Sequence, residues 1–106
     1  MTPLPPPGPV EHDDRYGWML CFWGEACDFT IPFRSWLDQI ALRLDAAIAL
    51  PVRTAGEDFV EGSLAFDGQT LAVYYEFSLG YLSLAHASKA VMTVTHQRLL
   101  GACSAA

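Results

Sequence analysis

The stretch from Glu57 to Ala85 constrains the fold of this chain most, because it places a hairpin turn between segments rich in strand-forming residues. The turn is Asp67-Gly68, since both central residues of a type I′ turn need positive φ and this pair tolerates it. Counting outward from the turn gives the opposed pairs Phe66 and Gln69, Leu64 and Leu71, Gly62 and Val73, and Val60 and Tyr75. We therefore predict two antiparallel strands in a defined register, because a slip of one residue would exchange their two faces.

A third strand is expected after a second turn near Gly80, where a glycine permits positive φ. Matching Phe77 and Tyr75 to Leu82 and Leu84 keeps one face of all three strands apolar. The other face, here called the outer face, carries Phe59, Glu61, Ser63, Ala65, Thr70, Ala72, Tyr74, Glu76, Tyr81, Ser83 and Ala85. None of these outer side chains is needed for the core in this register.

The outer face is predicted to be an acidic, aromatic surface. Tyrosine buries area at low entropic cost, and carboxylates attract a partner of opposite charge, so these residues together suit protein recognition. The candidate partner-binding residues are Glu57, Asp58, Glu61, Tyr74, Glu76 and Tyr81. The alternative interpretation is that tyrosines merely suit a strand surface, where aromatic residues are common.

An earlier strand is predicted over Arg15 to Gly24, RYGWMLCFWG, which is apolar on both of its faces. Such a strand belongs in the interior of a sheet or in an interface, although its neighbours cannot be deduced. Its second face needs a cover, and the candidates are the N-terminal segment, the C-terminal segment or another copy of the chain. Residues 1–14 begin with PLPPPGP and are expected to form an extended proline-rich tail, outside a single domain of residues 15–106.

Two further segments have helical patterns. A long helix is expected from about Pro32 to Leu50, because apolar residues recur at three- and four-residue spacing and Pro51 disfavours continuation. The segment from Ser88, SKAVMTVTHQRLL, fits a short helix or a fifth strand; Ser88 as a cap favours helix, with Gly101 ending it. The predicted fold is α+β: an antiparallel sheet of four or more strands with the long helix on one face.

Composition excludes several classes of function. The 106 residues carry twelve acidic and six basic side chains, a net charge of −6, whereas nucleic-acid binding needs a basic stripe. We expect no nucleic acid, but a basic protein partner is allowed; the alternative is that the acidity only aids solubility. No run approaches the ~20 apolar residues of a membrane span, and the first residues lack secretory-signal features, so we expect a cytoplasmic protein without membrane association.

Motifs for catalysis or metal binding are not found in the sequence. There is no phosphate-binding glycine loop, GxSxG, HExxH or CxxC pattern, and the three histidines and three cysteines lack the spacing of zinc ligands. The odd number of cysteines suits free thiols in a reducing compartment. We therefore expect no enzyme activity, no metal and no cofactor.

The stretch LAVYYEFSLGYLSLA, with the order strand, helix and three strands over residues 15–87, resembles small bacterial immunity proteins. Such proteins neutralise a cognate polymorphic or contact-dependent toxin. The resemblance implies a non-enzymatic inhibitor that binds a basic toxin domain, such as a nuclease, and it identifies no particular binding residue. The rival hypothesis is a homo-oligomeric structural or accessory subunit, for example a homodimer, without a toxin partner.

Overall fold

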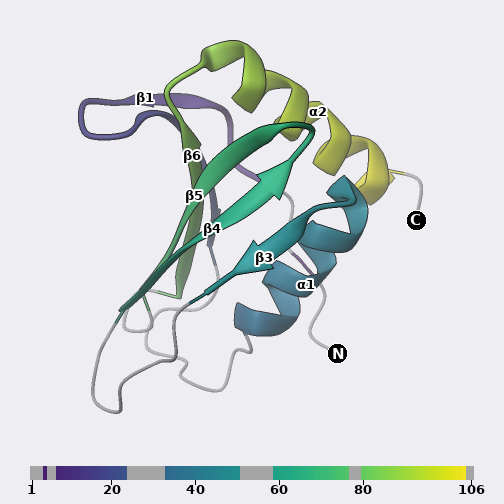
Figure 1. The fold of residues 1–106 in the computed structure, drawn as a ribbon. Coiled ribbons are helices and arrows are strands. Elements are labelled where there is room, and N and C mark those ends of the chain that lie inside the picture. Colours follow the sequence, from purple (N-terminus) through teal and green to yellow (C-terminus); the bar gives the residue numbers. More distant parts are fainter. Residues whose placement is uncertain (1–3, 5–6, 24–32, 51–58, 77–79, 105–106) are drawn as a thin grey trace.

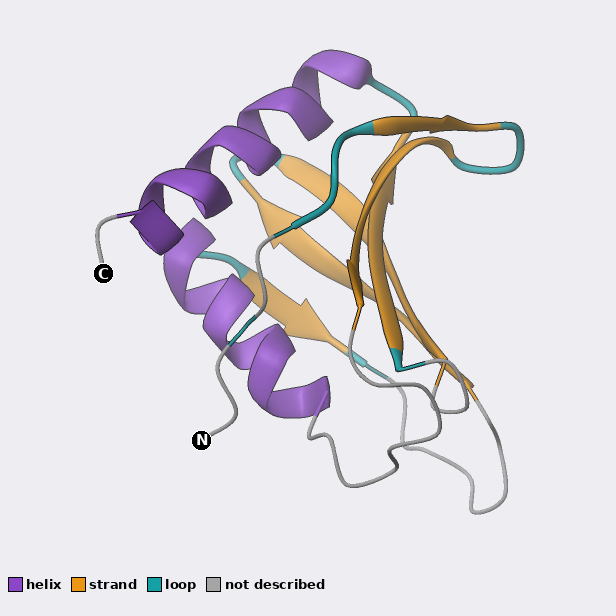
Figure 2. Cartoon of the chain, turned by 180° about the vertical axis from the view of Figure 1, so that it is seen from behind, coloured by secondary structure: helices purple, strands orange, loops and turns teal. Residues whose placement is uncertain are grey.

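The computed structural model describes residues 4, 7–23, 33–50, 59–76 and 80–104. Its elements are β1 Glu11–Asp13, β2 Gly17–Trp23, α1 Phe33–Leu44, β3 Ala47–Ala49, β4 Phe59–Phe66, β5 Gln69–Glu76, β6 Tyr81–His86 and α2 Lys89–Ser104. The strands form one antiparallel sheet in the order β1-β2-β6-β5-β4-β3, and both helices lie on the same face of it (Figures 1 and 2). The α+β class with an antiparallel sheet is thus confirmed.

The β4–β5 hairpin has the register that the Asp67-Gly68 turn predicts. All four predicted pairs are observed, and both turn residues have positive φ, 52° for Asp67 and 77° for Gly68. In the next hairpin Gly80 also has positive φ, but Tyr75 pairs with Leu82 rather than with Leu84. The predicted β5–β6 register is therefore wrong by two residues, an even shift that leaves every side chain on the expected face.

Helix α1 ends at Leu44, so the prediction that it runs to Leu50 is wrong. Asp45 takes a left-handed φ of 54°, and the amide of Ala46 donates to the carbonyl of Ala41 at 2.8 Å. The Asp45 amide donates a longer hydrogen bond, of 3.4 Å, to the carbonyl of Leu42. The two bonds together form the Schellman motif that ends many helices. The chain then turns back as β3, which pairs with β4.

The C-terminal segment is a helix, and it is longer than predicted. The Ser88 hydroxyl accepts a hydrogen bond from the Val91 amide at 3.4 Å, as a helix cap does. Gly101 does not end the helix, because α2 continues to Ser104. Among the described residues, neither helix is long and apolar enough to span a membrane.

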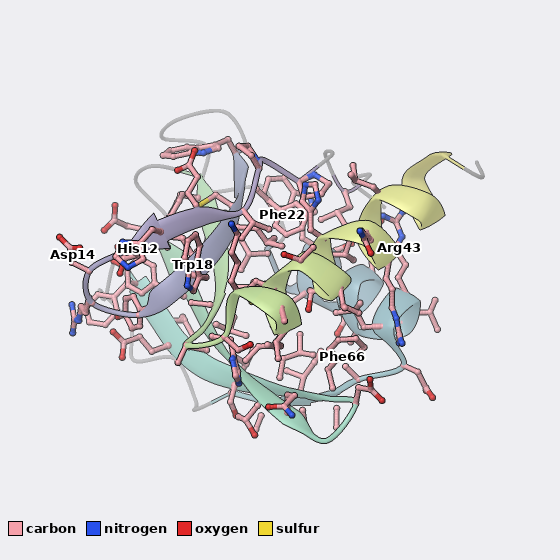
Figure 3. All side chains as sticks on the ribbon, turned by 90° about the horizontal axis from the view of Figure 1, so that it is seen from above. His12, Asp14, Trp18, Phe22, Arg43 and Phe66 are labelled. Atoms are coloured by element: carbon pink, nitrogen blue, oxygen red, sulfur yellow. The ribbon has the colours of Figure 1, made fainter. Side chains whose placement is uncertain are left out.

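The core lies between the sheet and the two helices. Phe22 and Phe66 point into this space from opposite parts of the sheet (Figure 3). The fully buried large side chains of this core are Leu20, Phe22, Leu37, Ile40, Leu64, Leu71, Val73, Tyr75, Leu82, Leu84, Met92 and Leu99. Alternate residues of every central strand therefore face the helices, and the residues between them face the other way.

Strand β2 occupies an interior position, between β1 and β6, as its apolar pattern indicates. Helix α2 packs on the face that carries Leu20 and Phe22. Residues before β2 also join the fold: Leu4 is only 7% exposed, its amide donates to Gln39 Oε1 at 3.2 Å, and the Gly8 amide donates to the Cys21 carbonyl at 2.8 Å. The segment interpreted as a tail thus contributes an edge strand and a core side chain.

Candidate functional site

The outer face carries a row of four aromatic side chains, one from each of four neighbouring strands. The row runs from Trp23 on β2 through Tyr81 on β6 and Tyr74 on β5 to Phe59 on β4. The distances between successive ring centroids are 4.6, 6.2 and 5.8 Å. We call these four residues the aromatic row, and no described helix or strand lies over the face that bears it.

The strand register explains why the rings meet. Trp23 stands directly opposite Tyr81, whereas Tyr81 and Phe59 both stand opposite Glu76, so each reaches Tyr74 diagonally. Aromatic side chains are long enough to contact diagonal neighbours across strands. The two ends of the row are the most accessible, with Trp23 58% and Phe59 44% exposed.

Carboxylates flank the aromatic row at its centre. The Tyr74 hydroxyl donates a hydrogen bond of 2.7 Å to Glu76 Oε1, and Glu61 is the cross-strand partner of Tyr74. Four of the predicted candidate residues are therefore close together: Glu61, Tyr74, Glu76 and Tyr81. The other two, Glu57 and Asp58, lie outside the described residues.

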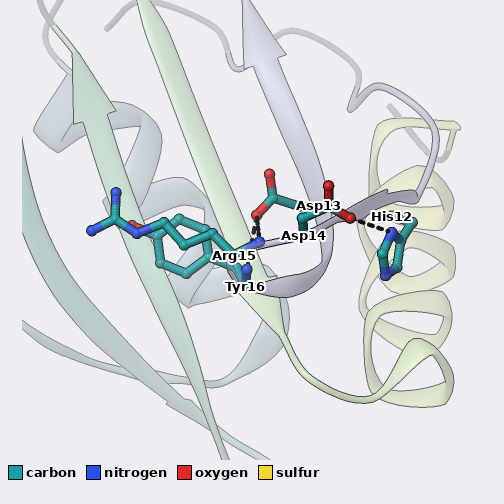
Figure 4. Close-up of polar contacts among 5 residues, drawn as sticks. All are labelled: His12, Asp13, Asp14, Arg15 and Tyr16. Carbon is teal, nitrogen blue, oxygen red and sulfur yellow. Dashed lines mark hydrogen bonds and ion pairs between the residues drawn. The ribbon is translucent and has the colours of Figure 1, made fainter.

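The turn between β1 and β2 adds a residue that the sequence pattern did not single out. Asp13 Oδ2 accepts hydrogen bonds from the amides of Arg15, at 2.9 Å, and Tyr16, at 2.8 Å (Figure 4). Gly17 follows with a φ of 98°, and Tyr16 borders a hollow of the outer face. The alternation of apolar residues predicts Tyr16 within the strand, whereas an Asp at the start of a tight turn that a Gly follows is the sequence signal for the turn.

Tyr16, Tyr74 and Tyr81 line a cavity of about 300 Å³, here called the tyrosine cavity. It is also bordered by Met19 and Ser83 on the strands and by Asp13 and Arg15 on the turn. Ser83 is only 4% exposed, although it lies on the face that no described helix covers. The tyrosines and the turn thus border an open hollow above the middle of the sheet.

Cys21 lies on β2, two residues before Trp23, and contacts Tyr81 of the aromatic row. Its thiol donates a hydrogen bond of 3.4 Å to the Tyr81 hydroxyl. Burial raises the pKa of the Cys21 thiol, and burial also raises the pKa of Tyr81. At neutral pH both groups therefore keep their protons, so the pair offers neither a thiolate nucleophile nor a phenolate base.

Histidine, cysteine and carboxylate side chains form no evident metal site in the part of the chain that the structure describes. No three histidine, cysteine, aspartate or glutamate side chains there are arranged to hold a metal ion. His12 Nδ1 lies 3.6 Å from Asp14 Oδ1 (Figure 4). The imidazole also meets the Trp18 ring edge-on (Figure 3). This exposed contact belongs to the β1–β2 hairpin rather than to the aromatic row.

The chain matches no known protein family, no curated protein and no solved structure. The function of the outer face is therefore inferred from its side chains and their geometry.

Proposed function

We propose that this chain is a non-enzymatic inhibitor that binds a basic protein domain through its outer face and so blocks it. The specific form that we propose is an immunity protein of a bacterial toxin system, acting on its cognate toxin in the cytoplasm. The observation that carries the proposal is the aromatic row, which crosses four strands on a face without a described covering element. Buried aromatic anchors supply much of the binding energy in protein interfaces.

The charges on the outer face support a basic partner. Its described acidic residues are Glu11, Asp13, Glu61 and Glu76, and its described basic residue is Arg15. The whole chain adds a net charge of −6, which attracts a basic domain and repels phosphate backbones. Attraction of this kind accelerates association and weakens with salt, because charges are screened over about 8 Å at physiological ionic strength.

The size of the outer face is sufficient for a specific complex. The two longest dimensions of the molecule are 35 and 32 Å. A standard protein interface buries about 800 Å² on each partner, which is less than a face of these dimensions offers. One sheet face can therefore hold the entire contact, with tyrosines at its centre and carboxylates around them.

The experiment is co-expression of this chain with the toxin domain encoded by the neighbouring gene, followed by binding measurements on the purified pair. We expect rescue of growth, and an association rate that falls as salt rises. Glu61→Gln should slow association, and Asp45→Asn is the matched control, because it removes the same charge at the end of α1, outside the outer face. An Asp45→Asn variant that slows association as much as Glu61→Gln would locate the contact elsewhere.

A homo-oligomeric subunit is the second candidate, and one observation favours it. Trp23 and Phe59 are large apolar side chains exposed at the two ends of the aromatic row, and a second copy of the chain could bury them. Light scattering alone and with the toxin domain separates the two proposals. A self-associated species that salt does not dissociate, and that binds no toxin domain, would favour the homo-oligomer.

A further inference from the structure

We infer that the tyrosine cavity receives an arginine side chain of the bound protein. The inference deepens the proposed function and rests on it for the source of the arginine. The site itself is a property of the described residues: three tyrosines from the β1–β2 turn, β5 and β6 surround one cavity, with Asp13 at its border.

The dimensions of the cavity suit a side chain. Its volume of about 300 Å³ lies at the lower end of the range of small-ligand pockets, which is about 300–1,000 Å³. Met19 and Ser83 border it from the sheet, so an aliphatic stem can contact a methionine while a polar head meets hydroxyl groups. Arginine has this division between a long stem and a planar, hydrogen-bonding head.

The chemistry of the cavity favours a cation. Tyrosine ring faces attract cations, and the attraction increases where water is displaced. Glu61 and Glu76 lie beside Tyr74, and Asp13 borders the cavity directly, so carboxylates outnumber the one positive group, Arg15. A bound cation would therefore contact aromatic rings and would also lie in a net negative potential.

Both arginine and lysine contact aromatic rings in this protein, since Lys89 Nζ lies 4.9 Å from the centroid of the Trp18 ring. Arginine is favoured for the cavity because of the shape and weaker hydration of its head group. The Arg15 guanidinium carbon lies 5.2 Å from the centroid of the Tyr16 ring, and that of Arg98 lies 4.9 Å from the centroid of Phe66. A planar guanidinium stacks on aromatic rings, whereas an ammonium is a compact, strongly hydrated point charge. Arg15 is exposed at the border of the cavity, where its charge opposes the entry of a second cation.

The test uses N-acetyl-arginine amide as the probe and N-acetyl-citrulline amide, its neutral counterpart of similar shape, as the control. Both are titrated into the ¹⁵N-labelled full chain, and amide chemical shifts are recorded. We expect saturable shifts at Tyr16, Met19, Tyr74, Tyr81 and Ser83 with the arginine amide, at millimolar affinity, and none with the citrulline amide. Equal shifts with both compounds, or shifts located elsewhere, would overturn the inference.

Two variants that each remove one positive charge test whether the ligand of the cavity is a cation or an anion. Arg15→Gln should tighten binding of the arginine amide about twofold to fivefold, because it removes a like charge from the border of the cavity. Arg98→Gln also removes an arginine stacked on a ring, but on α2, and should leave the affinity unchanged. If Arg15→Gln weakens binding, Arg15 is itself a ligand group and the site is for an anion.

The aromatic walls are tested by Tyr74→Leu and Tyr81→Leu, each of which should weaken the arginine amide at least fivefold while the remaining amide spectrum stays dispersed. Failure of this inference and failure of the proposed function are distinguishable. If the toxin domain binds and the arginine amide does not compete with it, only the arginine site is wrong. If the amide binds at the cavity but no basic domain does, the proposed function is wrong and the guanidinium site remains.

Discussion

Tyr74 and Tyr75 are neighbours in β5 that point to opposite faces, so the same substitution at each should have opposite consequences. Tyr75 is fully buried between the sheet and the helices, and Tyr75→Ala should lower the free energy of unfolding by about 3–5 kcal/mol. Tyr74 is half-buried and contacts Phe59, Tyr81 and Glu76 on the outer face. Tyr74→Ala should cost only about 1 kcal/mol of stability.

The assay is urea denaturation followed by far-ultraviolet circular dichroism, with the slope m compared between variants. A domain of this size is stable by about 5–15 kcal/mol, so Tyr75→Ala removes a large part of its stability and Tyr74→Ala does not. In the binding assay the order reverses: Tyr74→Ala should weaken the complex by about 1–3 kcal/mol. Comparable destabilisation by both substitutions would refute the assignment of the two faces, and with it the proposed contact surface.

Three other changes test separate parts of the structure. Asp45 has a left-handed φ that glycine adopts without strain, so Asp45→Gly should raise the free energy of unfolding by about 0.5 kcal/mol in urea titrations; a decrease would show that the Asp side chain stabilises this helix end. A Cβ on Gly62 would lie 2.6 Å from the Ala49 carbonyl oxygen, so Gly62→Ala should cost about 1–3 kcal/mol and accelerate amide exchange in β3, and unchanged exchange would contradict the β3–β4 pairing. Burial raises the pKa of Cys21, and the hydrogen bond with Tyr81 lowers it by a smaller amount. In a chain that carries Cys27→Ser and Cys103→Ser, alkylation of Cys21 should therefore become fast only at a higher pH than alkylation of a free thiol, and Tyr81→Phe should shift the pH dependence of alkylation still higher. The folded state holds this thiol proton more tightly than the unfolded chain does, so its contribution to stability is complete below the unfolded pKa and is lost as pH rises through the folded pKa.

Local signals in the sequence predicted the β4–β5 hairpin fully, because the Asp67-Gly68 turn determines both the turn type and the register. They predicted only the face, and not the register, of β6. The reason is that the alternation of side chains determines which face each residue lies on, whereas it does not determine how many residues form the loop before Gly80. The outer face and its tyrosines were therefore predictable even though one strand was displaced by two residues.

Other features depend on tertiary structure and could not be deduced from pattern alone. Asp45 lies inside the range predicted for the long helix, because aspartate adopts left-handed φ far less often than glycine and so gives no clear stop signal. Gly101 is a typical helix end by sequence, but α2 continues through it. Tyr16 joins the candidate site only because the β1–β2 turn brings it beside strands distant in sequence. The periodicity of the sequence does not indicate a contact of this kind.

The position of β2 also determines the order in which the protein can assemble. Strands β3 to β6 pair with their neighbours in sequence, whereas β2 pairs with β6, and 60 residues separate Cys21 from Tyr81. Closing so long a loop is slower than forming local hairpins, so pulse-labelled hydrogen exchange should show the amides of β4 and β5 protected before those of β2. During synthesis β2, apolar on both faces, waits for its partner while those residues are translated, about 3–12 s at typical elongation rates. An interior strand of the finished sheet is thus left without its long-range partner on the ribosome until β6 has been made.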